Sequence, residues 1–181
     1  MNALYKYTNE ALEAVQQDTL TTLGIKERDD LQRVLRDNID AVSPDTLVIA
    51  EEYSNWKDSN RRIDILGIDP DGSIVVIELK RTEDGGHMDL QAIRYAAMVS
   101  TLTFDQALEA FESYCSAAGN EVDAKESLLA HLNCEPEEIG QQTRIVLVSA
   151  DFSSEISTAA LWLNQQGLNL TCIRLTAYKD G

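Results

Sequence analysis

The sequence predicts an α/β fold in which helices cover both faces of a mixed β-sheet. Two apolar runs at 62–68 and 73–80 are joined by an Asp-Pro-Asp-Gly turn at 69–72, which is typical of a β-hairpin. Because both runs are almost continuously apolar, we expect the sheet to be buried on both faces. A strand–helix–strand pattern at 143–175 then predicts a βαβ unit, and therefore a parallel pair of strands.

The chain before the hairpin contains one well-marked helix. Residues 9–17 are polar and compatible with a helix, so we expect a helical opening there. A short apolar run at 47–50 predicts a strand, and the polar segment 51–60 after it indicates a loop or an extension of an edge strand. The helix between these segments is predicted by residues that recur at spacings of three and four, namely Arg28, Leu31, Val34, Leu35 and Ile39.

Three helices are predicted between the hairpin and the βαβ unit. The first, at 88–102, is apolar and contains alanines, and it follows a break with two glycines. The other two, at 104–117 and 123–132, form a helical hairpin in an acidic region. Residues 105–138 hold nine acidic side chains and one basic side chain, Lys125.

The βαβ unit closes the predicted fold. Its strands are expected at 143–149 and 168–175, with a helix at 154–166 between them. Gly167 stands where a residue that ends a helix is expected.

Composition indicates one folded domain and excludes several other classes of protein. The chain has 181 residues, 44% of them hydrophobic and 25% charged, as in ordinary globular domains. It has no run of eighteen apolar residues, its polar start with Glu10 is unlike a signal peptide, and we expect no membrane association. Three widely spaced cysteines exclude a zinc ribbon, and they favour reduced thiols and a cytoplasmic location.

The net charge conflicts with nucleic-acid binding. With 31 acidic and 15 basic residues the chain carries −16, whereas nucleic-acid-binding domains are typically basic. Composition alone therefore indicates a soluble enzyme or an interaction module.

The predicted hairpin brings two carboxylates together. A three-residue loop at 70–72 would place Asp64 directly opposite Glu78, and Lys80 would share their face of the sheet. Two carboxylates on a core-facing surface repel each other and lose hydration, and a divalent cation would offset both costs. The alternative is that Lys80 simply pairs with one of the acids at the edge of the sheet.

Two further features lie on helices near this pair. Gln91 and Tyr95 are four residues apart and so share one face of the helix that should pack on the sheet. A simple hydrogen-bonded pair is the structural alternative for them. Glu27 stands at the head of the helix over 28–39, where an acidic residue also suits the helix dipole.

These residues together resemble the PD-(D/E)XK nuclease superfamily. The resemblance lies in Arg62-Ile63-Asp64, a gap of thirteen residues, and then Glu78-Leu79-Lys80-Arg81. Gln91 and Tyr95 match the Gln-x-x-x-Tyr motif of its RecB-like members, and the surrounding sequence is most similar to the catalytic domain of archaeal NucS-type endonucleases. The similarity is strongest over residues 27–95 and extends to the later strand–helix–strand, with Ile63 where the superfamily name has proline.

The resemblance implies roles for individual residues. Asp64 and Glu78 would bind Mg²⁺ or Mn²⁺ together with the Leu79 backbone carbonyl, and Lys80 would orient the attacking water. Glu27 would be the acidic residue that the superfamily carries on a helix, with Asp29 and Asp30 as alternatives, and it could be a further metal ligand. Gln91 and Tyr95 would position Lys80 or the nucleic acid.

Basic residues around this segment could contact the nucleic acid. The candidates are Lys57, Arg62, Arg81, His87 and Arg94. His87 directly precedes the 88–102 helix, so its alternative role is to cap that helix.

The resemblance also implies a fold and a function. We expect one restriction-endonuclease-like domain over 1–181 with an αβββαβ core, at about 25–100 and 143–178, and the acidic helical hairpin inserted at 103–140. The expected function is metal-dependent hydrolysis of phosphodiesters as an endonuclease, with DNA as substrate rather than RNA. The alternative is a catalytically silent domain of the same fold that binds nucleic acid or protein, and a homodimer or a protein partner at the acidic hairpin stays open.

Overall fold

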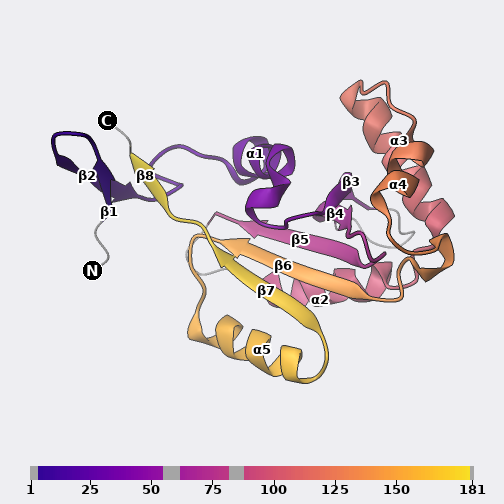
Figure 1. Cartoon of the computed structure of the whole chain (residues 1–181). Helices are drawn as coiled ribbons and strands as arrows, with labels where there is room; N and C mark the ends of the chain where they lie inside the picture. The colour runs from indigo at the N-terminus through magenta and orange to yellow at the C-terminus, as the bar shows by residue number, and fades with distance from the viewer. Residues whose placement is uncertain (1–3, 55–61, 82–87, 180–181) are drawn as a thin grey trace.

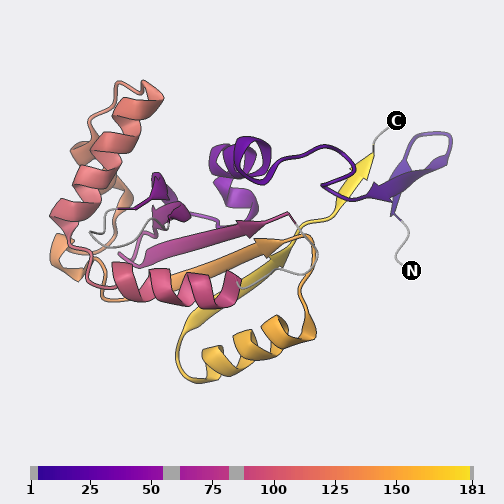
Figure 2. The same ribbon diagram turned by 180° about the vertical axis from the view of Figure 1, so that it is seen from behind.

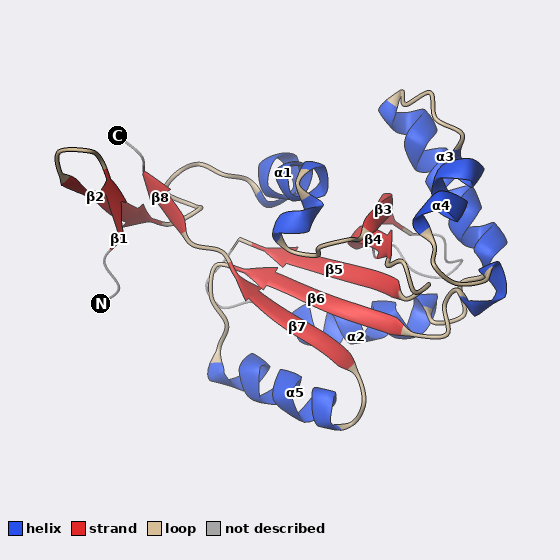
Figure 3. Ribbon diagram, viewed as in Figure 1, coloured by secondary structure: helices blue, strands red, loops and turns tan. Residues whose placement is uncertain are grey.

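The structure is a computed structural model that describes residues 4–54, 62–81 and 88–179 (Figure 1). Its strands form a five-stranded sheet and a separate three-stranded sheet, which Figure 3 shows apart from each other. The larger sheet has the order β3-β4-β5-β6-β7, with strands Leu47–Tyr53, Ile63–Ile68, Ile74–Lys80, Thr143–Ser149 and Asn169–Arg174. The smaller sheet has the order β1-β2-β8, with strands Leu4–Tyr7, Leu12–Asp18 and Ala177–Lys179.

The central sheet is mixed, as the sequence predicts. The pairs β3–β4 and β4–β5 are antiparallel, whereas the pairs β5–β6 and β6–β7 are parallel. The β4–β5 hairpin has the predicted register, with pairs that run from Ile68 and Ile74 at the turn to Ile65 and Ile77. A backbone hydrogen bond of 3.0 Å from Asp69 to Ser73 closes the turn, and both hairpin strands are almost wholly buried.

Helices cover both faces of this sheet (Figures 1 and 2). One face is covered by a wider π-type turn, η1 (Glu27–Gln32), which runs directly into α1 (Arg33–Asp37). Leu31 and Leu35 from this segment pack in a core cluster with Ile77 and Leu79 of β5. The other face is covered by α2 (Met88–Val99) and α5 (Ser154–Gln165), whose core residues include Tyr95 and Ile156.

The predicted helical hairpin is present between α2 and β6. It consists of α3 (Phe104–Ala118) and α4 (Ala124–His131), and it lies at the β3 edge of the sheet in Figure 1. Thr103 caps α3 in a reciprocal arrangement with Gln106, and Gly119 ends that helix with a left-handed backbone. The order α1-β3-β4-β5-α2-β6 is therefore the restriction-endonuclease-like αβββαβ core, with α3 and α4 inserted.

The predicted helix at 9–17 is wrong. This region forms part of the turn and most of β2 in the β1–β2 hairpin, where Tyr7 pairs with Leu12, and β2 then pairs with β8 from the other end of the chain. The pairing with β8 joins Gln17 to Tyr178, a contact that no local pattern in the sequence reveals. The predicted extension of the edge strand at 51–60 is confirmed as far as Tyr53, where β3 ends, and residues 55–60 lie outside the described residues.

Two smaller elements complete the described chain. They are short 3₁₀ turns, η2 (Ile39–Ala41) after α1 and η3 (Pro136–Glu138) before β6. In the described residues, no helix has the length and apolar character needed to cross a membrane.

Candidate active site

Asp64 and Glu78 lie on neighbouring strands at the end of the hairpin away from its turn. The Asp64 Oδ2 atom accepts a hydrogen bond of 2.7 Å from the backbone N–H of Leu79, which follows Glu78 on β5. Gln32 supports Asp64 from η1, since its Nε2 donates to the Asp64 carbonyl at 3.1 Å. The Asp64 carboxylate is therefore held against β5 by the backbone of the residue next to Glu78.

Glu78 is a buried acid with little compensation. Its side chain is 0% exposed, and neither carboxylate oxygen accepts a hydrogen bond from a described residue. Its one close charged partner among the described side chains is Lys80, whose Nζ lies 3.4 Å from Glu78 Oε1. Burial raises the pKa of Glu78, and the nearby charge of Asp64 raises it further. Burial also raises the pKa of Asp64, although the Leu79 hydrogen bond opposes that change.

Lys80 links the buried acid to Glu27. Its Nζ donates to Glu27 Oε1 at 3.3 Å, and the backbone N–H of Arg81 donates to Glu27 Oε2 at 2.9 Å. Burial alone would lower the pKa of Lys80, but the charges of Glu78, Asp64 and Glu27 raise it above its ordinary value. Lys80 is therefore held as a cation among three carboxylates.

The structure also distinguishes among the acidic candidates on η1. Glu27 reaches Lys80 and Arg81, whereas Asp29 pairs with Lys26 at 3.1 Å and Asp30 accepts the Lys26 backbone N–H at 2.9 Å. Glu27 is thus the η1 acid whose contacts join it to the carboxylate pair.

Gln91 and Tyr95 share a face of α2, as their spacing predicts. The Gln91 Nε2 atom donates to the Tyr95 hydroxyl at 3.1 Å, and Tyr95 is only 1% exposed. Burial is the main cause that raises the pKa of Tyr95, and the charge of Glu78 adds to it. The Tyr95 ring packs in the core cluster on the α2 face of the sheet, together with Leu66 and Val76.

The basic residues that were predicted to contact nucleic acid differ in their exposure and in their partners. Arg62 is exposed and pairs with Glu52 at 3.6 Å, while Arg81 donates through Nη1 to the Ile25 carbonyl at 3.3 Å. Arg94 is exposed on α2, one position before the buried Tyr95. Lys57 and His87 lie outside the described residues.

Two polar residues at this end of the sheet were missed by the reasoning from sequence. Gln32 is 4% exposed and contacts the Asp64 backbone, yet a glutamine in a helical pattern carries no signal of burial. Glu52 has a left-handed backbone with φ 50°, which is uncommon for a residue other than glycine. The register flanks it with the pairs Glu51–Ile65 and Tyr53–Ile63, so Glu52 lies beside Asp64 across the two strands.

The donor set fits a hard divalent cation only in part. Among the described residues, no three His, Cys, Asp or Glu side chains gather closely enough to hold a metal ion. The carboxylates of Asp64 and Glu78 nevertheless lie on neighbouring strands. The Glu78 oxygens are buried and accept no hydrogen bond from the described residues, which suits oxygen atoms that bind a cation. Asp64 and Glu78 are the adjacent carboxylates that would hold a cation, and the role of the Leu79 carbonyl stays a prediction.

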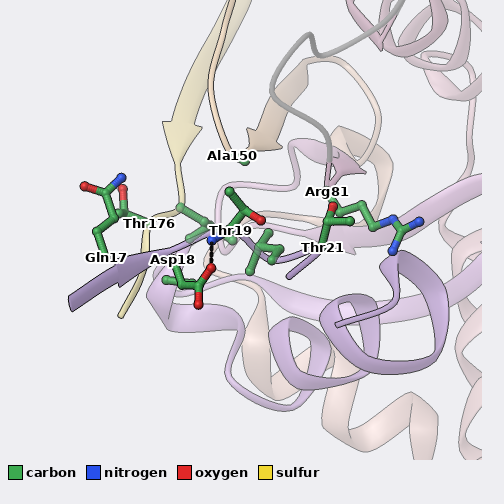
Figure 4. Close-up of a pocket in the computed structure, with 10 residues that line it drawn as sticks. Gln17, Asp18, Thr19, Thr21, Arg81, Ala150 and Thr176 are labelled. Carbon is green, nitrogen blue, oxygen red and sulfur yellow. Dashed lines mark hydrogen bonds between the residues drawn. The ribbon is translucent and has the colours of Figure 1, made fainter. Parts of the chain in front are cut away.

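A cavity of about 380 Å³ is lined in part by Arg81, the residue after Lys80 (Figure 4). It opens between the end of β2 and the segment that joins β7 to β8, and its lining includes Thr19, Thr21 and Thr176. Among the described residues that line it, Arg81 alone belongs to the predicted site, so the carboxylate pair does not line this cavity.

Comparison with known proteins gives matches among solved structures. No protein-family model matches the chain, and no curated protein is significantly similar to it. A repair endonuclease from Pyrococcus abyssi is 19% identical over 82% of this chain and 47% of its own, with a TM-score of 0.47. A complex of EndoMS with double-stranded DNA is 19% identical over 80% and 43% of the two chains, with a TM-score of 0.44.

EndoMS in its apo form gives a third match, 18% identical over 83% and 46% of the two chains, with a TM-score of 0.43. The chain spans about half the length of each structure that it matches.

Proposed function

We propose that this chain hydrolyses phosphodiester bonds of nucleic acid, with DNA as the substrate and Mg²⁺ or Mn²⁺ as the cofactor. The observation that carries the proposal is the Glu78 carboxylate, which is fully buried without a hydrogen-bond donor and lies beside Asp64 and Lys80. Such an arrangement is costly for folding, and costly titratable groups of this kind cluster at functional sites.

Asp64 and Glu78, together with the Leu79 carbonyl, would hold the cation. When bound, a divalent cation lowers the pKa of a coordinated water and neutralises charge on a phosphate. The Leu79 N–H fixes Oδ2 of Asp64 at 2.7 Å, so Oδ1 is the oxygen of this carboxylate that would bind the cation. The Glu78 carboxylate accepts no hydrogen bond from a described residue, and it would release the proton that its raised pKa favours when it binds the cation.

Lys80 supplies a fixed positive charge next to these carboxylates. Because its pKa is raised, it stays protonated at neutral pH, so it acts as a hydrogen-bond donor and not as a base. We infer that its ammonium group orients the attacking water and stabilises negative charge that develops on the phosphate. Glu27 holds Lys80 from the other side at 3.3 Å and thereby sets its position.

The proposal is tested by cleavage of labelled single-stranded, branched and duplex DNA in Mg²⁺, Mn²⁺ and EDTA. We expect cleavage that depends on the cation and that is abolished in Asp64→Ala. The matched control is Asp105→Ala, which removes an exposed carboxylate from the first turn of α3. Cleavage that persists in Asp64→Ala, or in EDTA, would refute the assignment.

The alternative is a silent domain of the same fold that binds a partner. The net charge of −16 favours it, because a duplex-binding surface is ordinarily basic. Under that alternative, no tested DNA would be cleaved in any cation, while Asp64→Ala would leave the binding of the partner unchanged.

A further inference from the structure

Two arginines converge on one carboxylate at the active end of the sheet. Arg28 Nη2 lies 3.0 Å and Arg62 Nη1 lies 3.6 Å from the same atom, Oε2 of Glu52. The three residues come from separate elements, since Arg28 is on η1, Glu52 is on β3 and Arg62 directly precedes β4. The convergence is therefore a product of the fold and not of local sequence.

The cluster borders the residues to which we assign catalysis. Arg28 directly follows Glu27, which holds Lys80, and Arg62 stands two positions before Asp64. Glu52 itself lies beside Asp64, between the strand pairs Glu51–Ile65 and Tyr53–Ile63. A phosphate held by the two arginines would thus be a neighbour of the phosphate at the carboxylate pair.

The arginines are accessible, whereas the acid is held in place. The side chains of Arg28 and Arg62 are 62% and 51% exposed, but that of Glu52 is 21% exposed. The left-handed backbone of Glu52, with φ 50°, is a conformation that persists only where the surroundings impose it, and it recurs at functional sites. An ordinary surface ion pair contributes little to stability and would not require such a backbone.

We propose that Arg28 and Arg62 clamp a backbone phosphate of the bound nucleic acid next to the scissile one, and that Glu52 takes the place of this phosphate in the free protein. The inference rests on the proposed function and deepens it. Planar guanidinium groups bind phosphate oxygens through paired hydrogen bonds, as they bind a carboxylate. Glu52 would keep the two cations together in a protein whose net charge is −16.

The test measures binding separately from cleavage. The probe is a fluorescein-labelled 20-base-pair duplex DNA, titrated by anisotropy in Ca²⁺ at several salt concentrations. We expect Arg28→Gln and Arg62→Gln each to weaken binding about tenfold, and each to reduce the salt slope by about 0.9. Glu52→Gln should tighten binding about threefold or more, because the phosphate no longer competes with a carboxylate.

Two control variants account for generic charge effects. Arg33→Gln removes an exposed arginine from α1, and Asp29→Asn removes an acid of η1 that pairs with Lys26. Each should move affinity by less than about twofold, because neither contacts Glu52. Thermal midpoints of all variants verify that they are folded.

A combined variant tests whether Glu52 affects binding through the two arginines. In the Arg28→Gln/Arg62→Gln background, Glu52→Gln should no longer tighten binding, because no clamp is left to release. If the arginine variants bind like Arg33→Gln while the wild type binds and cleaves DNA, the clamp is refuted and the proposed function stands. If the wild type neither binds nor cleaves DNA, the proposed function fails, and the clamp fails with it.

Discussion

At the scale of single residues, the electrostatics of Glu78 dominate the site. Its carboxylate is fully buried, and burial and the charge of Asp64 raise its pKa. The ammonium group of Lys80, 3.4 Å away, balances its negative charge only in part. The folded state therefore binds a proton more tightly than the unfolded chain does. This difference couples the stability of the metal-free protein to pH.

The coupling has a definite sign. Burial and Asp64 raise the pKa of Glu78 from 4.5 to about 8, so between these values the folded state holds more protons, and stability falls as pH rises. We expect Glu78→Gln to be more stable than the wild type at pH 8 in EDTA, on the order of a few kcal/mol, with a smaller difference at pH 5. Urea unfolding at both pH values measures this. Parallel pH dependence of the two proteins would contradict it.

Lys80 has opposite effects on metal binding and on catalysis. Its positive charge repels a cation at Asp64 and Glu78, so Lys80→Gln should bind Mn²⁺ about five- to tenfold more tightly by calorimetry. Cleavage should nevertheless fall about 100-fold or more, because the donor to the reacting groups is lost. Lys125→Gln, an exposed change on α4, is the control. Weaker metal binding in Lys80→Gln would mean that Lys80 maintains the arrangement of the carboxylates.

At the scale of elements, the inserted helical hairpin is anchored by close backbone contacts. Gly140 follows η3 and has a left-handed backbone with φ 79°, and a Cβ atom there would lie 2.4 Å from the Leu102 carbonyl oxygen. Leu102 precedes α3, so this contact joins the two ends of the insert. Gly119, at the end of α3, is also left-handed with φ 69°, but a Cβ atom there would meet nothing within 4 Å.

These two glycines make a matched pair of predictions. Gly119→Ala should cost about 1 kcal/mol, the ordinary penalty of a left-handed alanine. Gly140→Ala should cost about 3 kcal/mol or more, because the backbone must also shift to relieve the contact with Leu102. Urea unfolding measures both free energies. Equal costs for the two variants would show that the insert adjusts without strain.

At the scale of the whole molecule, charge sets the conditions for binding. The chain carries −16, and Asp64, Glu78 and Glu27 surround Lys80 where a phosphate would bind. A phosphate within a few ångströms of these carboxylates is repelled by several kcal/mol at an effective dielectric of about 20. A bound divalent cation reverses the sign of this local potential.

Binding of nucleic acid should therefore require a divalent cation, even one that does not support cleavage. Anisotropy titrations of duplex DNA in Ca²⁺ and in EDTA, at matched ionic strength, should differ about tenfold or more in affinity. The Asp64→Asn/Glu78→Gln variant should show little difference between the two buffers, because it has lost both the repulsion and the cation. Equal affinities for the wild type would place the nucleic acid away from this site.

The sequence by itself determined the centre of the fold and the core of the candidate site. The turn at 69–72 and the strict alternation of strand side chains fix the register of the hairpin, which brings Asp64 to the strand position beside Glu78. The spacing of Gln91 and Tyr95 fixes their shared face in the same way. These relations are local, so hydrogen bonding between neighbours in the chain decides them.

Only the tertiary structure decided the remaining features. The pairing of β2 with β8 joins the two ends of the chain, and it overrode a polar segment with no strong local preference at 9–17. Contacts across the fold likewise set the burial of Gln32, the left-handed backbone of Glu52 and the meeting of Arg28 with Arg62. Gln32 and Asp64 are 32 positions apart, and Arg28 is 24 positions from Glu52, so the packing of η1 on the sheet fixes their approach and no periodicity in the sequence reveals it.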